Sequence, residues 1–268
     1  RVQAVFANHD DEPAALARHA FVREALATCG IALHTSKDQV IFERSELLTQ
    51  TGKPYAVFTP YQRAWLAKLD AHDLAAHDAR PYADALAPRP PAHRQGLPTL
   101  AALGFEATNL SRLALPAGAA GGHRLLTEFL HRIDRYDERR DYPALRGPSY
   151  LSVHLRFGTV SIREAMRAAH PLAQAGSTGA ATWRSELVWR DFYFQVLANF
   201  PHVADESGQG HSFRREFDAI DWEDGPQAEA LFAAWCEGRT GYPLVDAAMT
   251  QLNQTGYMHN RLRMVTAS

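Results

Sequence analysis

Residues 2–42 read VQAVFANHDDEPAALARHAFVREALATCGIALHTSKDQVIF, and apolar segments alternate there with polar ones. Acidic residues followed by Pro13 predict the start of a helix, which runs to Cys29 and stops at Gly30. The strands predicted around this helix are residues 2–6, 31–34 and 40–42. Strand, helix and strand in this order favour α/β packing.

The pattern changes beyond this segment. Apolar residues at helical spacing predict a helix near residues 58–69, and prolines and glycines then dominate residues 73–122, which read as a linker. Further helices are predicted at residues 149–156, 161–169, 180–199, 226–237 and 242–255, with a last one beginning near Tyr257. We therefore divide the sequence into an α/β module (1–72), a linker (73–122) and an all-helical module (123–268).

The amino-acid composition excludes some classes of protein and leaves others open. The 268 residues include 46% hydrophobic residues, enough to bury a core, which excludes an intrinsically disordered chain. Lys and Arg total 28 against 30 Asp and Glu, a net charge of −2 that still permits a local basic face for nucleic acid. The absence of a long apolar run predicts no membrane span. Cys29 and Cys236 lie far apart without a CxxC motif, so we predict no disulfide framework, no metal site and a cytoplasmic location.

The segment WRSELVWRDFY, residues 183–193, is the first candidate for chemistry. Glu186, Trp189, Arg190 and Tyr193 are spaced i, i+3, i+4 and i+7, so they share one helix face. A carboxylate, an indole, a guanidinium and a phenol on one face can hydrogen-bond to and stack on a planar ligand. The alternative is that the apolar residues form core and that Glu186 and Arg190 form an ordinary i,i+4 pair.

The segment GYMHNRLRM, residues 256–264, crowds polar groups into a short helical stretch. The amide of Asn260 can pair with a nucleobase edge, and Arg261 and Arg263 can contact phosphates. The alternative is a solvated arginine face with His259 hydrogen-bonded inside.

The segment RGPSYLS, residues 146–152, places a glycine turn and hydroxyls before a helix. Free backbone N–H groups at such a position bind phosphate. The alternative is that Ser149 is an N-cap. The sequence contains no Walker motif, GxGxxG fingerprint, serine triad or zinc-spaced cluster.

Together these segments resemble the DNA photolyase and cryptochrome family, most closely the bacterial class I photolyases of cyclobutane pyrimidine dimers. The stretches that carry the resemblance are ANHDDEP, GIALHTSKDQVIFE, VFTPYQRAWL, YDERRDYP, GPSYLSVHLRFGTVS, WRSELVWRDFY and GRTGYPLVDAAMTQLNQTGYMHNRLRMVTAS. They cover nearly the whole chain outside the linker.

The resemblance implies a partial Rossmann-like antenna domain followed by an all-α FAD-binding domain. It implies light-driven repair, in which photoexcited reduced FAD transfers an electron to a dimer flipped out of DNA. The antenna pigment would be methenyltetrahydrofolate or a deazaflavin. We expect UV-damaged DNA as partner, no membrane association and a monomer.

The resemblance also implies roles for individual residues. The expected cofactor-binding residues are Tyr136, Ser149, Tyr150, Leu151, Ser152, Trp183, Arg190 and Arg263. The expected DNA-binding residues are Arg140, Glu186, Trp189, Arg190, Tyr193, Asn260 and Arg261. The expected catalytic residues are Glu186, Trp222, Asn260 and Met264, with Trp222 as the outermost tryptophan of the photoreduction chain.

The sequence departs from the family pattern at identifiable positions. Pro148 stands where the family usually has threonine, so the phosphate site loses a hydroxyl and a backbone donor. Ala14 and Ala15 stand where folate-using members place an Asn-Glu pair. The segment also lacks both ends expected of a family member, so we expect residues 1–268 alone to be inactive.

Other interpretations stay open at the sequence level. A cryptochrome-like flavin photoreceptor would bind flavin and signal without repair, although Glu186, Trp189 and Met264 favour repair. A (6-4) photolyase would carry a second histidine where this chain has Asn260. A degraded or partial gene product would have no activity.

Overall fold

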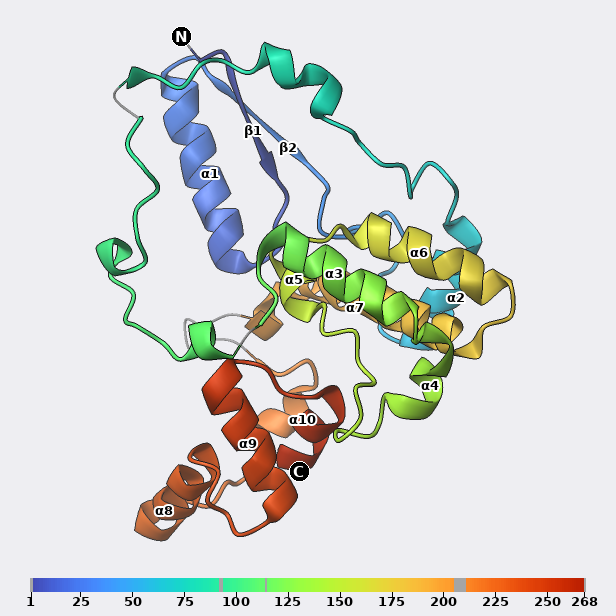
Figure 1. Cartoon of the computed structure of the whole chain (residues 1–268), viewed down its shortest axis with the longest axis vertical. Coiled ribbons are helices and arrows are strands. Elements are labelled where there is room, and N and C mark those ends of the chain that lie inside the picture. Colours follow the sequence, from blue (N-terminus) through green and yellow to red (C-terminus); the bar gives the residue numbers. More distant parts are fainter. Residues whose placement is uncertain (1, 92–93, 114, 205–210, 268) are drawn as a thin grey trace. The chain divides into compact units, whose positions relative to one another are not determined.

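A computed structural model describes residues 2–91, 94–113, 115–204 and 211–267. The chain forms two compact units, whose elements are labelled in Figure 1. The first unit comprises Arg1–Leu74 and Gly118–Gly225, and the second comprises Ala75–Ala117 and Pro226–Ser268. The division into modules at residues 72 and 122 stays a prediction.

The first unit begins with the predicted strand, helix and strand, namely β1 (Ala4–Asn8), α1 (Pro13–Thr28) and β2 (Ala32–Ser36). The strands pair in parallel, from Ala4 opposite Ala32 to Asn8 opposite Ser36. Parallel neighbours need a crossover connection, and α1 supplies it. Gly30 stops α1 as predicted, because its positive φ of 67° turns the chain while its N–H donates to the Ala27 carbonyl.

The strand predicted at residues 40–42 is wrong. These residues are buried, but they pair with no strand. The N–H groups of Ile41 and Phe42 donate instead to the carboxylate of Asp191, at 3.0 and 3.2 Å. A side chain 150 residues away thus takes the backbone donors that a sheet neighbour would have used.

Helices and the loops between them follow in the described part of the first unit. The α-helices are α2 (Phe58–Lys68), α3 (Gly118–Leu130), α4 (Tyr136–Arg139), α5 (Ser152–Arg156), α6 (Ile162–Gln174) and α7 (Thr178–Asn199). The 3-10 turns are η5 (Ile133–Arg135), η6 (Pro201–Ala204) and η7 (Arg215–Ala219). Ser161 caps α6 and Ser177 caps α7, because each side chain accepts an N–H from the first helical turn.

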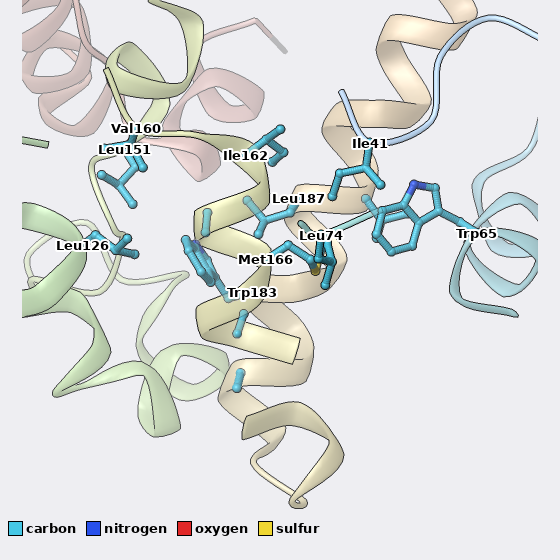
Figure 2. Packing of buried hydrophobic residues seen from close by; sticks show 14 of the residues in the cluster. Ile41, Trp65, Leu74, Leu126, Leu151, Val160, Ile162, Met166, Trp183 and Leu187 are labelled. Atoms are coloured by element: carbon cyan, nitrogen blue, oxygen red, sulfur yellow. The ribbon is translucent and has the colours of Figure 1, made fainter. Parts of the chain in front are cut away.

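The core of the first unit is built around α7, with α2, α3, α6 and the segment at residues 40–47 packed on it (Figure 2). Trp65, Phe129 and Met166 are completely buried there. The N-terminal turn of α7 approaches η5 closely at Gly179, where a Cβ atom would lie 2.1 Å from the Ile133 carbonyl oxygen. The packing of the core thereby determines which face of α7 points to solvent.

The second unit contains α9 (Pro243–Thr255), α10 (Asn260–Thr266) and, from its second residue onward, α8 (Gly225–Cys236). Its small core is formed by Ala248, Met249, Met258 and Leu262. Trp235 donates its indole N–H to the Thr266 carbonyl at 2.9 Å, which ties α8 to α10. The described part of residues 75–117 contains 3-10 turns, namely η1 (Arg80–Ala85), η3 (Ala101–Leu103) and η4 (Leu110–Arg112), and neither α-helix nor strand.

Three further findings concern membrane spans, cysteines and metal sites. Within the described ranges, every helix is too short or too polar to cross a bilayer. Both Cys29 and Cys236 are free thiols. In the same part of the chain, metal-ligating side chains nowhere gather in groups of three.

Candidate functional site

The residue after α4 and the middle of α7 meet in an ion pair. Arg140 donates from Nη1 to Oε1 of Glu186 at 2.5 Å, and their side chains are 20% and 31% exposed. The Arg140 guanidinium also lies over the Tyr136 ring, 5.5 Å from its centroid. The structure therefore brings together the predicted residues Tyr136, Arg140 and Glu186, which are far apart in the sequence.

Neighbouring groups favour the charged form of Arg140. Burial lowers the pKa of its guanidinium, but the charges of Glu186, Tyr136 and Asp141 outweigh burial and raise that pKa above its ordinary value. Asp141 lies 3.5 Å from Nε of Arg140. The partly exposed pair is thus a fixed, polar hydrogen-bonding group on the surface of the first unit.

Arg190 has other partners, so the ordinary Glu186–Arg190 pair considered as an alternative is wrong. Its guanidinium donates to the carbonyl of Gln39 and, at 3.3 Å, to the carbonyl of Leu155. Burial lowers the pKa of this guanidinium, with a smaller opposing effect from Asp191. Arg190 ties α7 to two loops, and its roles toward a cofactor and DNA stay predictions.

The aromatic residues of α7 divide between surface and core. Trp189 stacks on Phe58 of α2, with ring centroids 3.6 Å apart and an interplanar angle of 8°. Tyr193 stacks on Trp189 at 5.5 Å and is 62% exposed. Trp183, in contrast, is buried against Phe129 at 4.8 Å, as the core alternative expected. Tyr193 thus offers an exposed flat ring on which a base can stack, whereas Trp189 is partly buried and stacks on both Phe58 and Tyr193.

The loop at residues 146–152 has an unusual backbone. Gly147 packs against the main chain at the end of α4, where a Cβ atom would lie 2.4 Å from the Arg139 carbonyl oxygen. Tyr150 has a φ of 58°, in the left-handed region that side chains rarely adopt. Leu151 is the N-cap residue of α5, while Ser149 accepts the Leu151 N–H at 3.4 Å. Ser149 is therefore not the N-cap, and that alternative is wrong.

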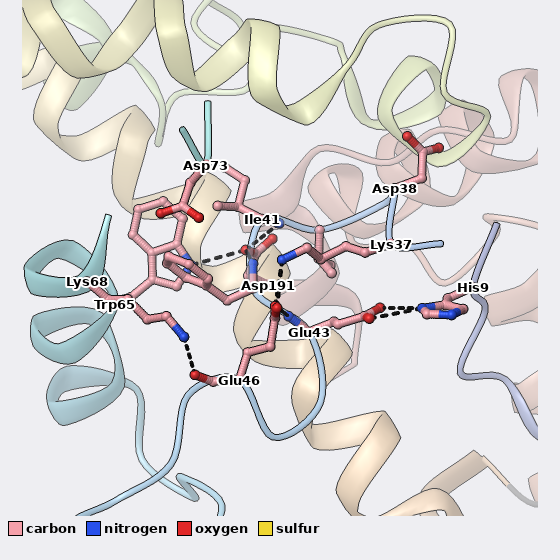
Figure 3. A network of polar contacts seen from close by, with 12 residues as sticks. His9, Lys37, Asp38, Ile41, Glu43, Glu46, Trp65, Lys68, Asp73 and Asp191 are labelled. Atoms are coloured by element: carbon pink, nitrogen blue, oxygen red, sulfur yellow. Dashed lines mark hydrogen bonds and ion pairs between the residues drawn. The ribbon is translucent and has the colours of Figure 1, made fainter. Parts of the chain in front are cut away.

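A buried carboxylate that the sequence analysis missed holds α7 in place. Oδ2 of Asp191 accepts the Ile41 and Phe42 N–H groups and the Trp65 indole N–H, the last at 3.1 Å (Figure 3). Burial raises the pKa of this carboxyl from 3.8 to about 6, although the hydrogen bonds oppose the rise. Asp191 thereby positions the helix that carries Glu186. In the sequence, the only sign of Asp191 was its position next to Arg190.

A second polar network lies near the ends of the strands (Figure 3). Nδ1 of His9 lies 2.9 Å from the carboxylate of Glu43, and its Nε2 lies 2.9 Å from the Thr35 hydroxyl. Lys37 pairs with Glu46 at 2.7 Å. These side chains satisfy one another, so the network joins β1 and β2 to the following loop.

The second unit carries the remaining predicted group. His259 is buried and caps α10, because its Nδ1 accepts the Arg261 N–H at 3.1 Å. The helix consequently begins at Asn260 and not near Tyr257 as predicted. Asn260, Arg263 and Met264 are exposed, and Nη1 of Arg261 lies 3.5 Å from Sδ of Met264. The buried His259 agrees with the alternative of an exposed arginine face.

Trp222 belongs to the first unit and lies outside its helices. Its side chain is 78% exposed. An exposed indole suits exchange of electrons with a solute, which is the role the resemblance implied.

Family models match both ends of the chain. A model described as DNA photolyase matches residues 1–82, and one described as FAD binding domain of DNA photolyase matches residues 183–268.

Curated relatives are similar over almost all of the chain. It is 37% identical to a deoxyribodipyrimidine photo-lyase of Synechococcus, over 100% of this chain and 55% of that protein. It is 39% identical to the photo-lyase of Halobacterium salinarum, over 97% and 53%, and 33% identical to that of Escherichia coli, over 100% and 54%. The chain therefore spans about half the length of the curated relatives it matches.

Solved structures show the same likeness. A class III photolyase from Agrobacterium tumefaciens superposes with a TM-score of 0.81 at 29% identity, over 99% of this chain and 53% of that one. An archaeal photolyase from Sulfolobus tokodaii, solved with two FAD molecules, gives 0.69 at 30% identity, over 100% and 53%. A cryptochrome from Synechocystis gives 0.74 at 22% identity, over 99% and 54%, which shows a shared fold alone.

Proposed function

Because this chain belongs to the DNA photolyase family, we propose that its parent protein repairs cyclobutane pyrimidine dimers in DNA by light-driven electron transfer. The observation that carries the proposal is the match to deoxyribodipyrimidine photo-lyases over the whole chain at 37% identity. The enzyme would be a carbon–carbon lyase. Its reduced FAD, when bound and illuminated, would lend the electron that splits the cyclobutane ring and would take the electron back once the two pyrimidines have separated.

The loop at residues 146–152 fits the diphosphate of FAD. Ser149 and Ser152 supply hydroxyls, and the left-handed backbone conformation of Tyr150 is of the kind found in backbone turns that bind anions. Pro148 supplies no N–H, so the remaining donors carry more of the binding. The other cofactor-binding residues proposed are Tyr136, Leu151, Trp183, Arg190 and Arg263.

The ion pair and the aromatic stack fit a flipped pyrimidine dimer. We expect Glu186 to hydrogen-bond to the dimer where charge develops on its oxygens, and Arg140 to hold that carboxylate and to contact DNA. Trp189 and Tyr193 would stack against the bases. Photolyases are among the enzymes that take their target out of the helix.

The second unit and the exposed tryptophan complete the proposed set. Asn260 would contact the lesion edge and Arg261 the phosphates, with Met264 beside the dimer. Trp222 would pass electrons from solution toward the flavin.

We further propose a Rossmann-like antenna domain at residues 1–72, a linker at 73–122 and an FAD domain at 123–268. The pair β1 and β2 with its crossover helix α1 supports the first of these. The antenna pigment would be methenyltetrahydrofolate or a deazaflavin. We propose a cytoplasmic monomer whose partner is UV-damaged DNA.

The test compares two lesions under blue light. The full natural chain, loaded with FAD and reduced, is incubated with an oligonucleotide carrying a thymine cyclobutane dimer or a (6-4) photoproduct. We expect the dimer alone to be repaired. Repair of only the (6-4) product would overturn the assigned substrate, and flavin photoreduction without repair of either would instead indicate a cryptochrome-like photoreceptor.

A further inference from the structure

Arg132 grips the backbone of the loop that is proposed to hold the cofactor phosphates. Its Nη1 donates to the Gly147 carbonyl at 2.8 Å, and its Nη2 donates to the Pro148 carbonyl at 2.9 Å. The guanidinium also lies over the Phe129 ring, 5.0 Å from the centroid. A guanidinium held by two carbonyls and an aromatic face has a defined position.

The two hydrogen bonds from Arg132 determine the direction in which the backbone N–H groups of the loop point. The peptide after Pro148 is trans, so its carbonyl and the N–H of Ser149 point in opposite directions. With that carbonyl on Arg132, the Ser149 N–H points away from Arg132. Two other features hold this turn, one on each side. Gly147 packs closely on the Arg139 carbonyl, and Tyr150 adopts the left-handed backbone conformation.

The loop also lies among positive charges. Burial lowers the pKa of the Arg132 guanidinium, and the nearby charges of Arg146 and Arg139 lower it further. Glu128 opposes them, but it pairs with Arg146 at 2.5 Å. Arg132, Arg139 and Arg146 place positive charge around this turn, which favours an anion beside the loop.

We propose that Arg132 is a positioning residue that presets the turn at residues 147–151 for the diphosphate of the dinucleotide. It acts at the point where Pro148 removes a donor, and it compensates by fixing the direction of the donors that remain. This inference rests on the proposed function, because that function supplies the diphosphate.

The test measures nucleotide affinity of the apoprotein, prepared from the full natural chain. FAD is titrated against wild type and Arg132→Gln, and ADP is then used as a competitor because it carries the diphosphate without the flavin. We expect Arg132→Gln to raise the dissociation constants of FAD and ADP by the same factor of about ten, which corresponds to about 1.4 kcal/mol. Arg135→Gln is the matched control, since Arg135 pairs with the exposed Glu138 at 3.0 Å and we expect less than a twofold change.

Arg132→Lys keeps the folded protein available if the glutamine variant fails to fold. Lysine keeps the charge but cannot reach two carbonyls with a planar fork, so we expect an intermediate loss of affinity for both nucleotides. Unchanged affinities, or a loss for FAD without a loss for ADP, would overturn the role of Arg132. Failure of the wild type to bind FAD would instead overturn the proposed function, before any variant is compared.

Discussion

Replacement of Asp191 by asparagine tests whether burial raises the pKa of the carboxyl that positions the helix carrying Glu186. The Asp191 carboxyl is fully buried, and its pKa in the folded protein is about 6 against an ordinary value of 3.8. In the unfolded chain the carboxyl ionises near the ordinary value. The folded state therefore binds more protons than the unfolded state between these two pKa values, and the contribution of Asp191 to stability falls as pH rises through this window.

The size of the effect follows from the two pKa values. Complete ionisation costs the folded state about 3 kcal/mol relative to the neutral carboxyl, and about 2 kcal/mol of this arises between pH 4.5 and 7. Asparagine has no charge to bury. However, its amide would occupy the place of Oδ1, which has no hydrogen-bond partner, and this adds a cost of about 1–3 kcal/mol that does not depend on pH.

The assay is urea unfolding of wild type and Asp191→Asn at a series of pH values from 4.5 to 7. The difference between the two free energies of unfolding isolates residue 191, because the other titrating groups are common to both proteins. We expect the variant to gain about 2 kcal/mol relative to wild type as pH rises across this range. A difference that is flat with pH, or that moves in favour of the wild type, would refute a raised pKa at Asp191.

Further predictions concern the site and the core. Glu186→Ala should lower the repair yield per photon much more than the FAD content, and an equal loss of both would make Glu186 a structural residue. Gly179→Ala should lower the free energy of unfolding by about 2 kcal/mol, because the new Cβ would clash with the Ile133 carbonyl. Gly96→Ala, where a Cβ meets nothing, should change it by less than about 0.5 kcal/mol, and equal effects would contradict the close approach. Trp222→Phe should slow photoreduction of the flavin but leave repair by chemically reduced protein unchanged; a loss of both would argue against an electron-entry role.

Local signals predicted local structure well. The helix predicted at residues 180–199 is α7 (Thr178–Asn199), and the stop at Gly30 follows from a positive φ that glycine adopts freely. Pro243 begins α9 because a first helical turn needs no N–H from it. In each case the deciding interaction lies within a few residues.

Interactions between distant residues could not be predicted in this way. The apolar run at residues 40–42 has the composition of a strand, yet Asp191 binds its backbone. The partner of Glu186 is Arg140, 46 residues away, and not Arg190 one turn along the same helix. Helical spacing places Glu186 on a face, but the fold decides which cation reaches it.

The positions of the proposed site residues came from the family resemblance more than from periodicity. Periodicity alone could not separate Trp183, which is buried in the core, from Trp189, which is partly buried and stacks on Phe58 and Tyr193. It also gave no sign of Arg132, whose partners are backbone carbonyls. Every residue has a backbone carbonyl, so the residue type does not reveal which carbonyl accepts a hydrogen bond.

The most direct test of the account is repair of a thymine cyclobutane dimer by the full natural chain under four conditions, with and without FAD and in light or darkness. The dimer is lost and intact thymines return, which can be followed by the recovery of ultraviolet absorbance. We predict repair only when reduced FAD and blue light are both present. Repair in darkness, or no repair by illuminated protein that holds reduced FAD, would contradict the proposal that the parent protein is a light-driven lyase.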